Sequence, residues 1–206
     1  MTFLYYTPVN TVTHTSVEKK SRFLTFVSEV SAKEQALEML GVIATKEVGA
    51  NHNCSAYIIG NPSSPKVIHC SDDGEPSGTA GKPLLNILVH ENIGNVLVVV
   101  TRYFGGIKLG SGGLVRAYSS GLKMALGGIE LKGFVAQKKM KISFHYQFEG
   151  VIRRTCEDRG AVILDTHYGV KPCFYLDVEE AGLESFIAEL QEITSGRVQV
   201  SLDRAV

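Results

Sequence analysis

The chain contains 206 residues, which is long enough for one or two domains with buried cores. Hydrophobic residues make up 44% of it and charged residues 20%, a composition that is typical of globular proteins and excludes intrinsic disorder. The 21 basic and 21 acidic residues give a net charge of zero, so no overall field attracts the protein to nucleic acid or to an anionic membrane. Any such binding has to come from a local patch.

The cysteines and the N-terminus indicate a cytoplasmic protein. The N-terminus has no basic segment followed by an apolar one, and the longest strongly apolar run, at 96–100, is too short to span a bilayer. We therefore expect neither a membrane segment nor a removed targeting peptide. The four cysteines form no C-x-x-C pair, which argues against a disulfide scaffold and a zinc ribbon; they are Cys54, Cys70, Cys156 and Cys173.

The first part of the chain alternates predicted strands with predicted helices. Residues 16–30 alternate in polarity as one or two strands. Ser31 followed by Glu34 predicts a capping box at the start of a helix that fades near Gly49. The pattern then predicts strands at 54–60 and 66–70, a helix near 83–92, a strand at 95–103 and a helix at 114–126.

A second domain is predicted after a glycine-containing boundary near 133–138. From there the sequence predicts a strand, a helix, two strands, a helix and a final strand. This βαββαβ order within about 70 residues is typical of a ferredoxin-like domain. We therefore predict an α+β protein with two domains, 1–135 and 136–206.

Two unusual loops flank the predicted strand at 95–103. The second loop, FGGIKLGSGG, places five glycines between Gly105 and Gly113 and leads directly into a helix. Free backbone N–H groups and the positive end of the helix dipole then point to one place, which favours an anion site. No Asp or Glu occurs between Glu91 and Glu130, so the local field is expected to be positive.

The predicted anion-binding or nucleic-acid-binding residues combine this loop with nearby basic side chains. Arg116, Ser120 and Lys123 share one face of the predicted helix, opposite its apolar residues. A plainer interpretation stays open, in which the glycines permit close packing and the basic residues form a solvated helix face. The full predicted set is Lys82, Arg102, Gly105, Gly106, Lys108, Gly110, Ser111, Gly112, Gly113, Arg116 and Lys123.

Known phosphate-binding motifs do not fit this stretch. A P-loop would need glycine at Pro76 and a hydroxyl residue at Pro83, and a dinucleotide fingerprint would need glycine at Val115. The segment LGSGG resembles the phosphate loop of the GHMP small-molecule kinases, over a short length only. These mismatches disfavour a nucleotide-dependent enzyme, and no cofactor is predicted.

The first loop, SDDGEPSGTAGKPLL, carries three carboxylates close together: Asp72, Asp73 and Glu75. Such a group can bind a magnesium ion or act as acid and base. The same residues are also typical of a turn before a helix, which is the interpretation we favour. If the two loops meet in space, Asp73 or Glu75 can form a structural ion pair with Arg102 or Lys82.

Histidines and cysteines offer a further hypothesis. His52 and Cys54 lie on one face of a predicted strand, and His69 and Cys70 precede the acidic loop. Together they could form a zinc site or a Cys–His nucleophilic pair. Cysteine is more often a small buried hydrophobic residue, so this spacing is only a weak indication of chemistry.

Three segments resemble the IMPACT family: HNCSAY at 52–57, SDDGEPSGTAGKPLL at 71–85 and VVVTRYFGGIKLGSGGLVRAYS at 98–119. The resemblance covers essentially the whole chain, and the two-domain layout is similar to bacterial, YigZ-like members. It implies an N-terminal domain with the ribosomal protein S5 domain 2-like fold. It also implies a C-terminal ferredoxin-like domain similar to the last domain of elongation factor G.

The resemblance implies a function as well. The eukaryotic family member regulates translation initiation under amino-acid starvation, and the bacterial members have a proposed association with nucleic acid or the ribosome. We therefore expect a non-enzymatic protein that binds RNA or the ribosome and regulates translation. The alternatives are an enzyme that acts on a phosphorylated small molecule through the glycine-rich loop, and a protein partner that covers the two loops.

Overall fold

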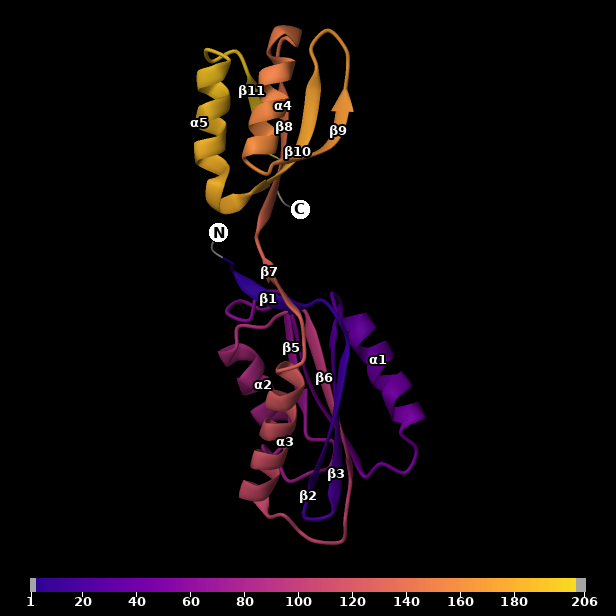
Figure 1. The fold of residues 1–206 in the computed structure, drawn as a ribbon. Helices are drawn as coiled ribbons and strands as arrows, with labels where there is room; N and C mark the ends of the chain where they lie inside the picture. Colours follow the sequence, from indigo (N-terminus) through magenta and orange to yellow (C-terminus); the bar gives the residue numbers. More distant parts are fainter. Residues whose placement is uncertain (1–2, 203–206) are drawn as a thin grey trace. The chain divides into compact units, whose positions relative to one another are not determined.

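The computed structural model describes residues 3–202, which divide into one unit that ends at residue 134 and another that starts at residue 135 (Figure 1). Each unit combines a β-sheet with helices. The predicted α+β class with two domains is therefore confirmed. Within the described range, no helix has the length and apolar character needed to cross a membrane.

The first unit is built on a five-stranded antiparallel sheet with the strand order β2-β3-β6-β4-β5. The central strand is the valine-rich segment, and nearly all of its residues are buried. A near-continuous apolar sequence suits this place because both faces of the strand are covered. The bounds are Val12–Glu18 for β2, Ser21–Glu29 for β3, His52–Ile59 for β4, Val67–Ser71 for β5 and Val96–Tyr103 for β6.

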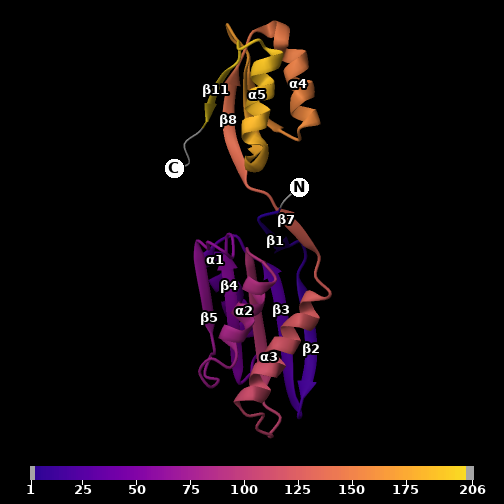
Figure 2. The same ribbon diagram turned by 90° about the vertical axis from the view of Figure 1, so that its left-hand side faces the viewer.

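Three helices cover this sheet, with the bounds Lys33–Lys46 for α1, Gly81–His90 for α2 and Ser111–Leu126 for α3. Two of them, α2 and α3, lie side by side on one face, and α1 covers the other face (Figures 1 and 2). Successive β6 side chains alternate between the two layers. Val98 packs with α2 and α3, whereas Val99 packs with α1.

Two predicted helix starts need correction. The helix predicted from residue 114 begins at Ser111, because the glycine segment before Leu114 already forms its first turn. The helix predicted after Ser31 begins at Lys33, one residue later than a cap at Ser31 would place it. Its capping contact therefore involves Gln35 instead of Glu34, and the Ser31 backbone N–H donates to Gln35 Oε1 over 2.9 Å.

A two-stranded sheet of the first unit was not predicted. Strand β1 (Tyr5–Pro8) pairs in antiparallel orientation with β7 (Leu131–Phe134), and the rings of Tyr5 and Phe134 stack with centroids 4.5 Å apart. Both strands are only four residues long, and each depends on a partner at the far end of the unit. Local sequence patterns therefore gave no signal for either strand.

The second unit has the sheet order β11-β8-β10-β9, with every neighbouring pair antiparallel. This order confirms the βαββαβ prediction. Helices α4 and α5 lie on one face of this sheet (Figure 2). The core is formed by the inward residues of the sheet and the apolar faces of these two helices. The bounds are Gln137–Ser143 for β8, Glu149–Asp158 for α4, Val162–His167 for β9, Cys173–Glu179 for β10, Leu183–Ile193 for α5 and Gln199–Leu202 for β11, with short 3₁₀ turns at Tyr146–Phe148 and Glu180–Gly182.

Candidate functional site

The alternation of side chains along β6 places Arg102 beneath α3. Val98 and Val100 point into the core under α2 and α3, and Arg102 continues this pattern in steps of two. In the antiparallel register, His52 of β4 and Phe23 of β3 lie beside Arg102 on the same face. A basic residue is thereby held at the end of an apolar layer.

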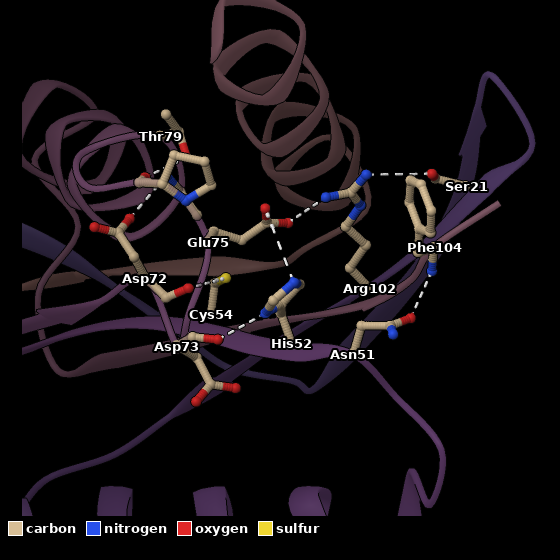
Figure 3. A network of polar contacts seen from close by, with 12 residues as sticks. Ser21, Asn51, His52, Cys54, Asp72, Asp73, Glu75, Thr79, Arg102 and Phe104 are labelled. Atoms are coloured by element: carbon tan, nitrogen blue, oxygen red, sulfur yellow. Dashed lines mark hydrogen bonds and ion pairs between the residues drawn. The ribbon is translucent and has the colours of Figure 1, made fainter. Parts of the chain in front are cut away.

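A buried ion pair joins the acidic loop to the end of β6. Arg102 Nη1 donates to Glu75 Oε1 over 2.6 Å, and the two side chains are only 6% and 3% exposed. The Tyr118 hydroxyl of α3 donates to the same oxygen over 2.8 Å. Figure 3 shows Glu75 between Arg102 and His52. The predicted ion pair between Glu75 and Arg102 is thus confirmed, and Arg102 is a buried cation.

The imidazole of His52 faces the same carboxylate. His52 Nδ1 lies 2.7 Å from the backbone carbonyl oxygen of Asp73. Because a carbonyl oxygen only accepts, Nδ1 carries the proton, and the lone pair of the neutral ring lies on Nε2. His52 Nε2 is 4.0 Å from Glu75 Oε2, which is too far for a direct hydrogen bond. In the neutral form of the ring, two hydrogen-bond acceptors therefore face each other across a gap.

Cys54 lies next to Tyr118 and the acidic loop, and its thiol is buried and protonated. Its sulfur is 3.2 Å from the Tyr118 hydroxyl and 3.0 Å from the carbonyl oxygen of Asp72. Burial raises the pKa of the Cys54 thiol to about 12, and the negative charge of Glu75 acts in the same direction. Burial also raises the pKa of Tyr118. Both groups stay protonated near neutral pH, so the geometry does not support a nucleophilic Cys54.

We expect thiol labelling to separate Cys54 from Cys70. Cys54 is buried, and with a pKa of about 12 its thiol is ionised in only on the order of one molecule in 10,000 at pH 8. Cys70, in contrast, is exposed to solvent. Iodoacetamide added to the folded protein should therefore modify Cys70 first, and Cys54 only after unfolding in urea. Peptide mass spectrometry measures both rates. Equal rates in the folded protein would contradict the assigned burial and protonation state.

The three carboxylates of the acidic loop do not converge. The Asp72 carboxylate accepts the backbone N–H groups of Gly78, Ala80 and Gly81 over 2.8–2.9 Å and so caps the start of α2. The Asp73 carboxylate accepts a hydrogen bond from the backbone N–H of Asn53, and the Glu75 carboxylate binds Arg102. Across residues 3–202, no three His, Cys, Asp or Glu side chains are grouped to hold a metal ion. The turn interpretation fits this geometry.

Two glycines of the second loop are explained by different features of the structure, one by a lack of space and one by its backbone conformation. A Cβ atom at Gly105 would lie 2.0 Å from the backbone carbon of Lys20, so only glycine fits there. Gly110 has a φ of 73° and precedes α3 as its N-cap residue, without a side chain that could cap the helix. The first backbone N–H groups of α3 are therefore free of any capping side chain, and its first turn contains no acidic residue.

A cavity of about 520 Å³ opens between these parts, and we call it the α3 cavity. Its walls are the ends of β4 and β6, the acidic loop and the start of α3. Sequence reasoning did not assign Asn51, His52 or Phe104 to an anion site, because their proximity depends on the register of β4 against β6. Of the predicted anion-binding residues, four line the cavity: Arg102, Lys108, Gly110 and Ser111. The others do not line it: Lys82, Gly105, Gly106, Gly112, Gly113, Arg116 and Lys123.

Three exposed basic residues mark the outer surface around α3, and we call them the basic stripe: Lys108, Arg116 and Lys123. Arg116 and Lys123 lie on one face of the helix, about 10 Å apart along its axis. Lys82 is exposed at the start of α2. In the described part of the chain, none of these four residues forms an ion pair. The stripe thus offers positive charge that no internal partner neutralises.

Comparisons with known proteins assign both units. Residues 19–126 match the model of the Impact N-terminal domain, and residues 142–197 match a domain of unknown function, DUF1949. An IMPACT family member from Haemophilus influenzae is 36% identical over 198 residues, which cover 96% of each chain. This chain belongs to the IMPACT family.

A second relative and a solved structure show similar coverage. The IMPACT family member YigZ of Escherichia coli is 32% identical over 197 residues, 94% of this chain and 95% of YigZ. A solved structure described as that of a hypothetical protein is 30% identical, covers 98% of both chains and superposes with a TM-score of 0.68. The resemblance to bacterial, YigZ-like members of the IMPACT family is therefore confirmed.

Proposed function

We propose that this IMPACT family protein binds RNA, free or within the ribosome, through the basic stripe and thereby regulates translation. The observation that carries the proposal is the exposed positive charge of Lys108, Arg116 and Lys123, which extends from the uncapped start of α3 to its last turn and forms no ion pair within residues 3–202. Helix N-termini with free N–H groups bind phosphate, and neighbouring basic side chains strengthen that binding. Contacts of this type position a strand without reading its sequence.

Gly112 supports the same proposal. It is exposed in the first turn of α3, and a Cβ atom there would meet nothing within 4 Å, so packing does not require glycine. Glycine within a helix is less favourable than alanine by about 1 kcal/mol. Gly112 and Arg116 are four residues apart and share a face. A bare backbone beside a basic side chain is an arrangement that suits close approach of a phosphate.

The family context is regulation of translation, since the eukaryotic IMPACT member that the sequence resembles acts on translation initiation. A cytoplasmic location is part of the proposal, and all four cysteines are free thiols, as a reducing compartment requires. A binding role is favoured over catalysis because Asp72, Asp73 and Cys54 are engaged in contacts that hold the loops.

Salt dependence tests the proposal. We expect the full chain to bind fluorescein-labelled single-stranded RNA of mixed sequence, with a log–log salt slope of about −2 for three phosphate contacts. Changing Lys108, Arg116 and Lys123 together to alanine should weaken binding at least tenfold and bring the slope close to zero. Arg102 is left intact in this variant because its loss would disturb the buried pair with Glu75.

A matched control removes the same charge elsewhere. Lys33, Lys46 and Lys66 are exposed on α1 and on the turn between β4 and β5, away from the α2 and α3 layer. Their replacement by alanine should leave RNA affinity within about twofold of the original. Fluorescence anisotropy at two or more salt concentrations measures both variants. Equal loss of RNA affinity in the two variants, or an RNA affinity of the unchanged protein that does not depend on salt, would contradict RNA binding by the stripe. A protein that binds the stripe would then be the remaining explanation.

A further inference from the structure

The α3 cavity has two chemically different ends. Lys108 and Ser111 line it where α3 begins, and this end offers positive charge and free backbone N–H groups. His52 and Glu75 line it at the sheet, and this end offers hydrogen-bond acceptors. A ligand that matches the cavity therefore carries an anionic group at one end and donor groups at the other.

Arg102 supplies independent evidence for a missing partner. It lines the cavity, its side chain is 6% exposed, and only its Nη atoms have hydrogen-bond partners in the described residues. Its Nε–H is buried without a partner among residues 3–202. The other two atoms in that state are threonine hydroxyls of β1 and β3 that do not line the cavity. A buried donor left unpaired is unfavourable, and a ligand hydroxyl at the sheet end can donate to Glu75 and accept from this N–H through its oxygen.

The acceptor end is similarly incomplete. Glu75 Oε1 receives hydrogen bonds from Arg102 and Tyr118, while the nearest described partner of Oε2 is His52 Nε2 at 4.0 Å. Because the Asp73 carbonyl fixes the proton on His52 Nδ1, Nε2 presents a lone pair. Two acceptors at this separation suit a hydroxyl or amino donor on each of them.

The two ends are close enough for one small molecule. Ser111 and Tyr118 are seven residues apart on α3, about 10 Å along the helix axis. Helical side chains lean toward the N-terminus, so the Tyr118 contact with Glu75 lies nearer to Ser111 than this distance. The cavity volume of about 520 Å³ is that of a small-molecule site. Phe104 adds an apolar ring to the lining.

We propose that the α3 cavity binds a small phosphate monoester whose hydroxyl or amino groups contact Glu75 and His52 while its phosphate contacts the start of α3. A sugar phosphate, a nucleoside monophosphate and the 5′-phosphorylated end of an RNA share this chemistry. The inference rests on the proposed function in one respect, since both place a phosphate at the start of α3. It differs in requiring His52 and Glu75 at the sheet end of the cavity, whereas Lys108 belongs to both the cavity and the basic stripe.

Calorimetric titration of the full chain tests this site with defined probes: inorganic phosphate, ribose 5-phosphate, adenosine 5′-monophosphate and adenosine. We expect ribose 5-phosphate to bind at least tenfold more tightly than inorganic phosphate, and adenosine to show no binding. Short RNAs with and without a 5′-phosphate distinguish a polymer end from a free metabolite. Equal affinity for inorganic phosphate and ribose 5-phosphate, or no binding of either, would overturn the proposal.

Two variants separate the ends of the cavity. Ser111→Asp places a carboxylate in the first turn of α3, which favours the helix but repels a phosphate, so every phosphate probe should lose at least tenfold in affinity. His52→Ala should reduce ribose 5-phosphate to the affinity of inorganic phosphate. Binding unchanged in folded Ser111→Asp, or selectivity retained in His52→Ala, would contradict the assigned ends.

The outcomes also separate this inference from the proposed function. If RNA binds to the stripe in a salt-dependent way but the phosphate probes all bind equally, the cavity proposal is contradicted and the RNA proposal is supported. Selective binding of ribose 5-phosphate without RNA binding would support the cavity ligand and contradict the RNA proposal.

Discussion

Replacing Arg102 with leucine is expected to lower the free energy of unfolding by about 3–5 kcal/mol, because Glu75 would stay buried without its cation. The Glu75 side chain is 3% exposed and receives its hydrogen bonds from Arg102 of β6 and Tyr118 of α3. Removal of one partner from a buried pair leaves the desolvation penalty of the other in place. The cost is therefore much larger than that of losing a surface ion pair.

Urea unfolding followed by circular dichroism measures this loss. Arg22→Leu is the matched control, because Arg22 is an exposed arginine of the neighbouring strand β3 and packs over the ring of Tyr103 at 4.2 Å. It should cost less than about 1 kcal/mol. The double variant with leucine at both Glu75 and Arg102 should be more stable than the sum of the single losses predicts. Strictly additive losses would show that the pair is not coupled.

Replacing Asp72 with asparagine is expected to lower the free energy of unfolding by about 1–3 kcal/mol near neutral pH. The carboxylate accepts three backbone N–H groups at the start of α2, with one oxygen bound to Gly78 and the other to Ala80 and Gly81. An asparagine amide has only one acceptor atom. Its NH₂ group would therefore oppose a backbone donor.

The Asp72 contribution should depend on pH. Burial acts to raise the pKa of the Asp72 carboxyl, but the hydrogen bonds from Gly78, Gly81 and Ala80 outweigh it, and the pKa is lower than its ordinary value. A carboxyl with a lower pKa in the folded state stabilises fully above its unfolded pKa of about 4 and loses this effect as the pH falls through the folded pKa. The difference between the protein and Asp72→Asn should accordingly narrow below about pH 4.

Unfolding in urea at pH 7, 4 and 2.5 tests this dependence. Asp73→Asn serves as the control, because Asp73 is exposed and an asparagine oxygen can still accept the backbone N–H of Asn53. We expect it to change stability by less than about 0.5 kcal/mol. A gap for Asp72→Asn that stays constant from pH 7 to 2.5 would exclude the ionised carboxylate as its cause.

Local patterns predicted most of the fold because they depend on residues close together in the chain. The alternation in β3, the valines of β6 and the apolar spacing of α5 each indicated the correct element. The short strands β1 and β7 were missed because their pairing joins opposite ends of the first unit. The start of α3 was placed three residues late because glycine is usually unfavourable in a helix.

The candidate site shows the same division. Glycine and acidic residues marked the two loops from composition alone, and the pairing of Glu75 with Arg102 followed from their charges once contact between the loops was assumed. The burial of Arg102 was not part of the sequence prediction, because burial at this position depends on the packing of α3 over the face of β6 that Arg102 shares with Val98 and Val100. His52 had been considered only as a metal ligand or catalytic base, whereas it lines the cavity beside Glu75.

The sequence by itself determined the two-domain α+β class, the order of nearly all helices and strands, and the position of an acid-free glycine loop before α3. The tertiary structure decided which side chains meet. The contacts of Glu75 with Arg102 and Tyr118 span 27 and 43 residues, and they depend on strand register and on the packing of α3 over the sheet. Such contacts are set by global packing, so no local pattern of residues can encode them alone.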